Sequence, residues 1–474
     1  MARKLYIGGE WLATNETFDV TNPYDGSLVD KVHLADSQTI EAAVKYSIDG
    51  FKRMRALSSA ERIQLLEKTV SLLKERREDF AISLCLEAGK CIRDARVEVD
   101  RTVMTFAFAK EEAGRIGGEF IPLDLNKASK GRFGITRRFP IGPILGISPF
   151  NFPLNLVAHK VAPALACGSS MVLKPATYTP ITALRLAEVI DEAGFPPGAL
   201  NVVACPRKAG QALVEDERFA LLTFTGSPDA GWKMKADAGK KKVVLELGGD
   251  AACIVDATAD MEQAAQRCII GAFAHAGQIC ISIQRILLEK SIADEFTERL
   301  VEKARALRMG DPRDDATELG PMITESAAKR AEEWVREAVD KGAKLILGGL
   351  RKGTMFPPTI LSGVRMDMHL GCDEAFAPIV CLYNWETFTD AINIVNSSRY
   401  GLQAGIFSRD AGRITRAWEE IEVGGVVAGD IPTYRIDHMP YGGVKDSGQG
   451  REGVRWAIHD MTEERLLVMN PPRD

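Results

Sequence analysis

The sequence predicts an α/β protein built on parallel β-sheets, and three observations support this fold class. Between residues 140 and 247, short apolar runs of strand length alternate with helical stretches. A second alternating region begins after residue 248. The chain has 474 residues, more than one hydrophobic core usually holds, so two or three domains are expected. Such alternation predicts βαβ units with helices on the faces of a parallel sheet.

The predicted elements follow in chain order. A helix over 58–89 is indicated by a capping box of Ser58 and Glu61 and by Gly89 as its stop. Strands are predicted at 144–148, 170–174, 200–204, 220–224 and 242–246, with helices near 154–167, 180–193, 208–216 and 228–238. Beyond residue 248 we expect a strand at 251–255 and helices near 260–274, 291–307 and 323–341.

Two strand-like segments, 131–139 and 465–469, belong to neither alternating region. Strands without a place in a sheet are candidates for pairing between subunits. An ordinary surface hairpin is the alternative, and connection statistics alone do not separate the two.

Composition excludes several classes of protein. The residues are 46% hydrophobic and 26% charged, and the net charge of −5 gives no reason to expect a nucleic-acid partner. The longest apolar runs are strand-sized, so no membrane span is predicted, and the basic N-terminus lacks an apolar core of signal-peptide length. Nine cysteines without CxxC spacing argue against disulfides and against a structural metal, which makes the cytoplasm the expected compartment.

Chemistry-bearing residues gather at the predicted strand ends. The segments 148–151, 174–175 and 225–227 each follow a strand, and ligands of parallel sheets bind beyond the carboxyl ends of the strands, so one shared cleft is predicted. Glu246 also ends a strand, and Cys280 lies downstream. A thiol nucleophile with a separate carboxylate base predicts covalent chemistry on a carbonyl. The G-x-G-x-x-G match at 448–453 does not follow a buried strand, and we interpret it as a false positive.

Seven segments carry a family resemblance. They are Pro149-Phe150-Asn151-Phe152-Pro153, Lys174-Pro175-Ala176, Phe224-Thr225-Gly226-Ser227, Leu245-Glu246-Leu247-Gly248-Gly249, Gly277-Gln278-Ile279-Cys280, Glu374-Ala375-Phe376-Ala377-Pro378 and the glycine-rich stretch 440–448. In this order they are similar to the PWNFP, KPA, FTGS, ELGG, GQxC, ExFGP and PFGGxKxSG segments of the aldehyde dehydrogenase superfamily. The chain resembles that family from about residue 5 to residue 470.

The resemblance implies a domain organisation. We expect a Rossmann-type dinucleotide-binding domain over 1–118 and 140–247 and an α/β catalytic domain over 248–440. A small β oligomerisation arm over 119–139 and 455–474 completes the expected fold. The implied assembly is a homodimer or homotetramer.

The resemblance also implies catalytic roles. Cys280 would attack an aldehyde as thiolate, with the Asn151 amide and the Cys280 backbone N–H stabilising the oxyanion. After hydride transfer a thioester remains, and Glu246 would activate the water that releases the carboxylic acid.

The implied cofactor is NADP or NAD. Its expected contacts are Ile147, Ser148, Pro149, Phe150, Lys174, Ala176, Thr177, Gly226, Ser227, Leu247, Glu374 and Phe376. Many NAD-preferring relatives have glutamate where this chain has Thr177, and that glutamate would repel a 2′-phosphate. The threonine therefore favours acceptance of NADP.

The substrate is an aldehyde whose identity the resemblance narrows only in part. Residues 430–440 are similar to a subgroup with lactaldehyde dehydrogenases and non-phosphorylating glyceraldehyde-3-phosphate dehydrogenases. A small hydroxyaldehyde or an anionic semialdehyde is expected, with substrate contacts at Arg101, Asn151, Ile279, Ile281 and Arg435. Arg101 is a candidate anion clamp, with a solvated helix charge as the alternative.

Three departures from the family pattern are His275, Ala377 and Gly429. We expect His275 to pack behind the nucleophile loop and Gly429 to widen the pocket. Two other classes stay open, namely a CoA-acylating enzyme, against which Glu246 argues, and a catalytically silent binding member.

Overall fold

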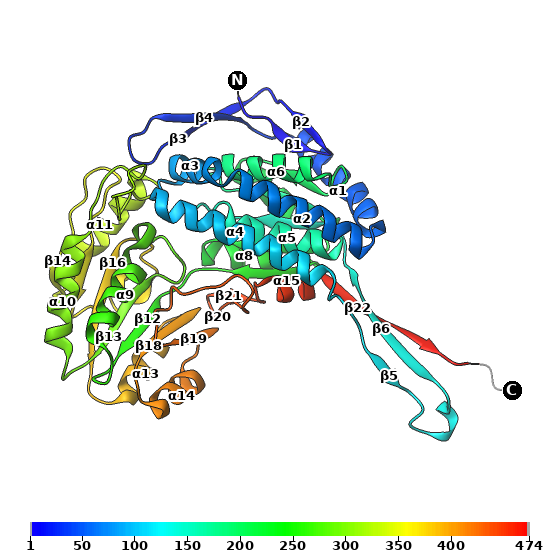
Figure 1. Cartoon of the computed structure of the whole chain (residues 1–474). Coiled ribbons are helices and arrows are strands. Elements are labelled where there is room, and N and C mark those ends of the chain that lie inside the picture. The colour runs from blue at the N-terminus through cyan, green and yellow to red at the C-terminus, as the bar shows by residue number, and fades with distance from the viewer. Residues whose placement is uncertain (1, 472–474) are drawn as a thin grey trace.

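The computed structural model describes residues 2–471, which form two β-sheets surrounded by helices and a projecting three-stranded arm (Figure 1). Residues 1 and 472–474, which the predicted domain boundaries include, lie outside the described residues. The predicted α/β fold class is confirmed. Within residues 2–471, no helix is both long enough and apolar enough to cross a membrane.

The first sheet has eight strands in the order β2-β1-β9-β8-β7-β10-β11-β21. The five strands from β9 to β11 are parallel, and β1, β2 and β21 join antiparallel at the edges. These five parallel strands are the ones predicted between 140 and 247. The strands are β1 (Leu5–Ile7), β2 (Glu10–Leu12), β7 (Ile144–Ile147), β8 (Met171–Lys174), β9 (Leu200–Val202), β10 (Leu221–Thr225), β11 (Lys242–Glu246) and β21 (Gly448–Gln449).

Helices from both ends of the chain pack around this sheet (Figure 1). They are α1 (Ser37–Ala56), α2 (Ser59–Glu75), α3 (Arg77–Ala88), α4 (Ile92–Ala113), α5 (Asn155–Cys167), α6 (Ile181–Ala193), α7 (Arg207–Glu215), α8 (Pro228–Asp237) and α15 (Val454–Asp460). The capping box at Ser58 and the left-handed Gly89 stop are confirmed. The single helix over 58–89 is wrong, because the chain turns at Arg76 so that α3 packs on α4 and α6.

The second sheet has seven strands in the order β14-β15-β16-β13-β12-β18-β19, all parallel except β14. Its strands are β12 (Ala251–Val255), β13 (Ile283–Glu289), β14 (Lys344–Leu347), β15 (Thr359–Ser362), β16 (Ile379–Trp385), β18 (Gln403–Phe407) and β19 (Gly425–Ala428). The accompanying helices are α9 (Met261–Phe273), α10 (Ala293–Ala306), α11 (Glu325–Asp340), α12 (His369–Cys372), α13 (Phe388–Asn396) and α14 (Ala411–Glu420). The strand and the three helices predicted here are confirmed.

Four short strands form two separate ribbons, and two 3-10 turns complete the elements. β3 (Thr17–Thr21) pairs with β4 (Leu28–His33), and β17 (Tyr400–Gly401) pairs with β20 (Val444–Lys445). The 3-10 turns are η1 (Lys127–Ser129) and η2 (Ala274–Gly277).

The two unplaced strand segments pair with each other in the projecting arm (Figure 1). The arm consists of β5 (Phe120–Pro122), β6 (Phe133–Pro140) and β22 (Thr462–Met469), in the order β22-β6-β5. Residues 455–460, predicted as part of the arm, instead belong to α15. This helix packs on α4 and α5 because its apolar residues Val454, Ala457 and Ile458 are buried in the first core.

Candidate active site

A cavity of about 580 Å³ lies at the carboxyl ends of the parallel strands of the first sheet. Residues that follow β7, β8, β10 and β11 line one side, and residues near Cys280 and Glu374 line the other. Parallel strands all end at the same edge, which is why segments distant in sequence meet there. The two halves of the chain therefore share one cavity.

Most residues predicted for the site line this cavity. They are Ser148, Pro149, Phe150, Asn151, Ala176, Thr177, Gly226, Ser227, Glu246, Leu247, Cys280, Glu374 and Phe376. Of the described residues predicted for the site, six lie outside the lining, namely Ile147, Lys174, Arg101, Ile279, Ile281 and Arg435. Ile147 and Lys174 are the last residues of β7 and β8, directly before lining segments.

Cys280 follows a backbone turn of unusual conformation. Residues 275–277 have successive φ angles of 49°, 53° and 68°, in the left-handed region. Two of these residues are not glycine, and such strain persists only where the surroundings hold it. Gln278 does so, because its side chain donates to the His275 carbonyl at 3.2 Å and accepts from the Ile323 amide at 2.9 Å.

His275 is buried behind this turn, as expected. Its ring packs edge-on against Phe152, with centroids 6.1 Å apart. Burial lowers the pKa of His275 well below its ordinary value, so the ring is neutral. The side-chain contacts of Cys280 are instead with Tyr441 and Glu246. The geometry gives no Cys–His pair.

The two glycines after Glu246 allow the halves of the chain to approach closely. A Cβ on Gly249 would lie 2.1 Å from the carbonyl oxygen of Cys280, and one on Gly248 would lie 2.5 Å from Oε2 of Glu374. The Gly249 amide also donates to Oε1 of Glu374 at 2.9 Å. A side chain at Gly249 would push the loop that carries Cys280 away from the first sheet, and one at Gly248 would displace Glu374.

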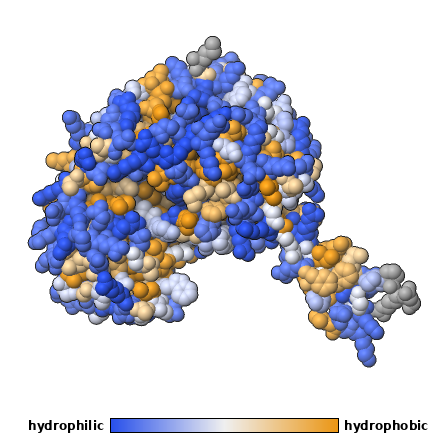
Figure 2. Space-filling view, in the orientation of Figure 1, coloured by the Kyte–Doolittle hydropathy of each residue, from blue (hydrophilic) through white to orange (hydrophobic). Residues whose placement is uncertain are grey.

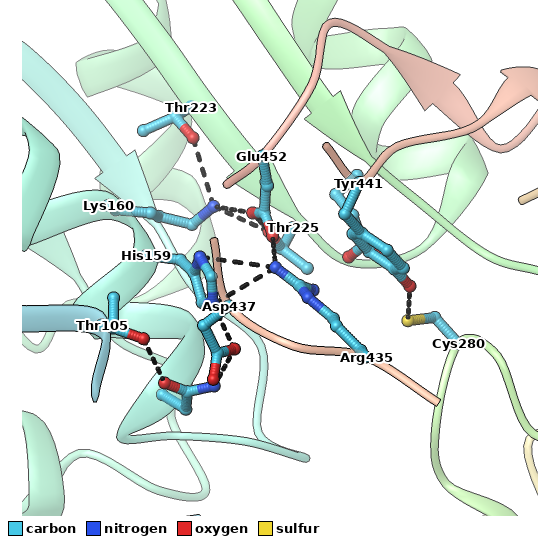
Figure 3. Close-up of polar contacts among 12 residues, drawn as sticks. Thr105, His159, Lys160, Thr223, Thr225, Cys280, Arg435, Asp437, Tyr441 and Glu452 are labelled. Carbon is cyan, nitrogen blue, oxygen red and sulfur yellow. Dashed lines mark hydrogen bonds and ion pairs between the residues drawn. The ribbon is translucent and has the colours of Figure 1, made fainter. Parts of the chain in front are cut away.

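Glu246 and Cys280 line the cavity, and the phenol of Tyr441 lies within hydrogen-bond reach of both. The Cys280 sulfur lies 3.0 Å from the Tyr441 hydroxyl (Figure 3), which donates to Oε1 of Glu246 at 3.4 Å. Burial raises the pKa of Cys280 well above its ordinary value, and the Glu246 charge raises it further. Burial, together with the nearby Glu452 charge, raises the pKa of Glu246 to about 7. Near neutral pH this carboxyl can therefore both accept and release a proton.

A buried group of charged side chains lies next to this triad (Figure 3). The Lys160 ammonium donates to Thr225 at 2.7 Å and lies 3.4 Å from Glu452, while Arg435 contacts Glu452 at 2.9 Å. Although burial opposes it, these two cations hold the pKa of Glu452 at about 2. Arg435 was predicted to bind substrate, but the structure places it in this ion pair and over the Tyr441 ring.

The Asp437 carboxylate accepts hydrogen bonds from three side chains on α4 and α5. It accepts from Nη2 of Arg101 at 2.7 Å, from Nδ2 of Asn155 at 3.1 Å and from Nε2 of His159 at 2.8 Å. Burial lowers the pKa of His159, so this ring is a neutral donor. Arg101 is therefore neither a solvated helix charge nor an unpaired anion clamp. Its guanidinium lies 5.7 Å from the Phe152 ring centroid.

An apolar wall stands beside the thiol. Ile279 and Ile281 pack with Leu402 and Tyr441, and Phe152 and Met439 lie against this cluster.

Gly429 directly follows β19. A Cβ added there would meet no atom within 4 Å among the described residues, so the space beside it is open.

Polar groups in the cavity are available to a ligand. Oγ of Ser148 and Oδ1 of Asn151 are buried without a hydrogen-bond partner among the described residues, although Nδ2 of Asn151 donates to the Gln278 carbonyl at 2.8 Å. No side chain caps the N-terminus of α8 after Ser227, and free amides there attract phosphate. The Phe150 ring packs edge-on against Phe376 at 5.9 Å. These groups fit a dinucleotide.

Comparison with known proteins decides the family. The model of the aldehyde dehydrogenase family matches residues 11–467. The chain belongs to the aldehyde dehydrogenase family. This membership confirms the resemblance seen in the sequence and makes the protein an NAD(P)-dependent oxidoreductase. The mixed parallel sheets are those of solved aldehyde dehydrogenases.

Three similar aldehyde dehydrogenases illustrate the range of the family. A 3-sulfolactaldehyde dehydrogenase of Priestia aryabhattai is 45% identical over 98% of both chains. Aldehyde dehydrogenase 21 of Physcomitrella patens, solved with the reaction product succinate, is 46% identical with a TM-score of 0.97, over 99% of this chain and 98% of that one. Glyceraldehyde-3-phosphate dehydrogenase GapN of Methanocaldococcus jannaschii, solved with NADP, is 38% identical with a TM-score of 0.92, over 96% and 100%.

Three residues of this aldehyde dehydrogenase site are not among those predicted from the sequence. Tyr441 was noted only as part of a motif, although a tyrosine where the family segment has phenylalanine was a visible signal. Arg207 lines the cavity from the start of α7, beyond any motif considered. Gln278 lay inside the GQxC match, but its anchoring of the turn depends on the distant Ile323 amide.

Proposed function

We propose that this enzyme oxidises a short, negatively charged aldehyde to its carboxylic acid and accepts NADP. One observation carries the proposal: the Cys280 thiol and the Glu246 carboxyl lie in a single cavity, both within hydrogen-bond reach of Tyr441. The neutral hydroxyaldehyde considered from the sequence is the less favoured substrate.

The first step joins the substrate to sulfur. The Cys280 sulfur attacks the carbonyl carbon, the thiol proton passes to Glu246, and the carbonyl electron pair moves to oxygen. An amide nitrogen carries two N–H donors, so Asn151 can hold the Gln278 carbonyl with one and the oxyanion with the other. The Cys280 backbone N–H supplies a further donor. When bound, the nicotinamide cofactor supplies the hydride acceptor for the oxidation.

The second step releases the product. After oxidation the carbonyl carbon is held to Cys280 as a thioester, and Glu246 has returned its proton to solvent. Glu246 then takes a proton from water, the water oxygen attacks the thioester carbon, and the C–S bond breaks. A carboxyl with a pKa of about 7 suits both steps, since it accepts and loses protons near neutral pH.

The cofactor residues support NADP. We propose that Ser148 and the N-terminus of α8 after Ser227 hold the diphosphate, and that Glu374 and Phe376 lie at the nicotinamide end. Thr177 brings no negative charge to the cavity, and Arg207 lines it as well. A guanidinium is suited to a 2′-phosphate, because it offers several donors and a permanent charge.

The Arg207→Ala variant is expected to lose about tenfold in kcat/KM for NADP, since a hydrogen bond to a charged group contributes about 1.5–3 kcal/mol. Activity with NAD should stay nearly unchanged, because NAD lacks the 2′-phosphate. Steady-state kinetics with both cofactors measure the difference. The control is Lys208→Ala, which removes the neighbouring exposed cation. Equal losses with both cofactors would contradict the 2′-phosphate contact.

The substrate proposal rests on charge. The three relatives are named for, or solved with, compounds that carry a sulfonate, a carboxylate or a phosphate. In this chain, Arg101 and Arg435 reach the apolar wall through Phe152 and Tyr441, and Nε of Arg435 is buried without a partner among the described residues. We propose that this region, which lies next to Cys280 and outside the cavity lining, accepts the anionic end of the aldehyde.

The Arg101→Ala variant is expected to raise KM for an anionic aldehyde about tenfold, through the lost charged contact and the uncovered Asp437. KM for a neutral aldehyde of equal length should change less than twofold. Kinetics with succinic semialdehyde and butyraldehyde make the comparison. Arg93→Ala on the same helix, which removes a more exposed cation, is the control. An equal rise in KM for both substrates would contradict the proposed anion site.

The proposed reaction is tested with a panel of short aldehydes and NADP, while reduced nicotinamide is followed by absorbance. Anionic aldehydes should give the highest kcat/KM. Turnover only in the presence of CoA would show an acylating enzyme. No turnover with any aldehyde would show a silent member of the family.

We also propose that the enzyme forms a homo-oligomer through its arm. Apolar side chains are exposed on β5, β6 and β22, where Figure 2 shows an apolar surface. They include Phe120, Ile135, Leu466, Leu467 and Val468. A projecting apolar arm of this kind is typical of an interaction surface. We propose the cofactor domain as residues 1–118 and 140–247 and the catalytic domain as 248–440, each around its own sheet.

A further inference from the structure

The Tyr441 hydroxyl occupies an unusual position for a buried phenol. It lies between the Cys280 sulfur at 3.0 Å and Oε1 of Glu246 at 3.4 Å, while the residue is only 2% exposed. The family segment that this stretch resembles has phenylalanine here, so the ring alone would fill the space. A buried hydroxyl without a hydrogen-bond partner is destabilising, so these two contacts determine where the hydroxyl points.

Arg435 fixes the phenol from the other side. Its guanidinium carbon lies 3.8 Å from the Tyr441 ring centroid, and the same guanidinium is held by Glu452 at 2.9 Å. The backbone of Glu452 pairs with that of Tyr441 through two hydrogen bonds, of 3.0 and 2.6 Å. A cation over the ring face withdraws electron density from the phenol, which makes its O–H a stronger donor.

The other surroundings of the sulfur disfavour a thiolate. Cys280 is held in an apolar cluster, and the facing carboxylate of Glu246 adds negative charge. Arg435 lies over the Tyr441 ring, and Lys160 is engaged with Glu452 and Thr225. The Tyr441 hydroxyl lies 3.0 Å from the sulfur, and either atom can be the donor while the thiol keeps its proton. Once the sulfur is a thiolate, the hydroxyl must be the donor. A hydrogen bond to the charged form of a group stabilises that form.

We propose that Tyr441 is a positioning residue that holds and stabilises the Cys280 thiolate. The S–H bond breaks with its electron pair left on sulfur, and the proton passes to Glu246. The Tyr441 O–H keeps its own proton and turns its hydrogen bond from Glu246 to the sulfur. This proposal rests on the proposed function only in naming Cys280 as the nucleophile.

The test measures the thiol itself, without any aldehyde. Iodoacetamide alkylation of Cys280 is followed by mass spectrometry of its peptide at a series of pH values, in the wild type and in Tyr441→Phe. The variant should move the midpoint of the alkylation profile up by at least one pH unit and slow alkylation at pH 7.5 about tenfold. Phenylalanine keeps the ring over Arg435, and a thermal melt confirms that the variant is folded.

Two further proteins sharpen the test. Tyr434→Phe removes an exposed hydroxyl from the same loop and should leave the profile unchanged. A 3-fluorotyrosine placed at position 441 is a more acidic phenol and should move the midpoint down. An unchanged midpoint in Tyr441→Phe would overturn the proposal, even if aldehyde turnover fell. If the midpoint moves while no aldehyde is oxidised, the proposed function fails and the role of Tyr441 stands.

Discussion

Replacing Glu246 with glutamine is expected to give an enzyme that reduces one equivalent of cofactor per subunit and then almost stops. Glu246 also takes the thiol proton in the first step, so the burst itself should be slower than in the wild type. Sulfur that has lost its proton to solvent can still attack and be oxidised, whereas an amide cannot take the proton of the attacking water. Loss of a general base lowers a rate by about 10²–10⁴-fold, so steady-state turnover should fall within that range. Stopped-flow absorbance gives the burst, and mass spectrometry identifies an acyl group on the Cys280 peptide.

The pH dependence of the wild type provides a second measure of the same carboxyl. Burial raises the pKa of Glu246 to about 7, and only the deprotonated form can accept a proton. Thioester hydrolysis should therefore fall about tenfold per pH unit below that value.

The control for Glu246→Gln is Glu386→Gln, which changes an exposed acid and should give no burst. A Glu246→Gln protein that accumulates no acyl group would show that the sulfur attack, and not hydrolysis, is the step that cannot proceed without this carboxyl.

Replacing Cys280 with alanine is expected to abolish aldehyde oxidation, with kcat/KM reduced by at least about 10⁴-fold, because the described cavity lining contains no second thiol. Cofactor binding should persist, since Cys280 does not belong to the strand ends that we propose as the dinucleotide site. Fluorescence titration with NADPH and steady-state kinetics separate the two properties.

The matched control for this prediction is Cys372→Ala. Cys372 is the other cysteine that is only partly buried among the nine free cysteines, and it lies on α12, outside the cavity lining. Its replacement should leave oxidation unchanged. Residual oxidation by Cys280→Ala above one per cent of the wild type would require a different nucleophile.

The parts of the fold that depend on local pattern could be predicted from the sequence. The strands from β7 to β11 follow from apolar runs, and the parallel topology then brings Ser148, Thr225 and Glu246 to one edge of the sheet. The end of α2 at Arg76 could not be predicted, because neither glycine nor proline marks it. That turn is set by packing of α3 on α4 and α6.

The surroundings of the nucleophile depended on contacts that no local pattern contains. Asp437 lies 336 positions from Arg101 along the chain. The ion pair between them fixes a guanidinium for which the sequence predicted no partner in the protein. Tyr441 stands 161 positions from Cys280. The sequence motifs predicted which reacting groups share the cavity. The burial, charges and hydroxyls that shift the pKa values of these groups result from tertiary packing.

The position of the loop that carries Arg435, Tyr441 and Glu452 has a consequence for protein synthesis. All three side chains follow residue 434, so they leave the ribosome well after Lys160, Cys280 and most strands of both sheets. Until they arrive, Cys280 lacks the Tyr441 hydroxyl, and Lys160 lacks the Glu452 carboxylate. Domains generally fold from the N-terminus as the chain emerges. A chain synthesised only as far as residue 434 therefore contains every strand of the second sheet and all strands of the first sheet except β21, but its thiol still lacks the Tyr441 hydroxyl.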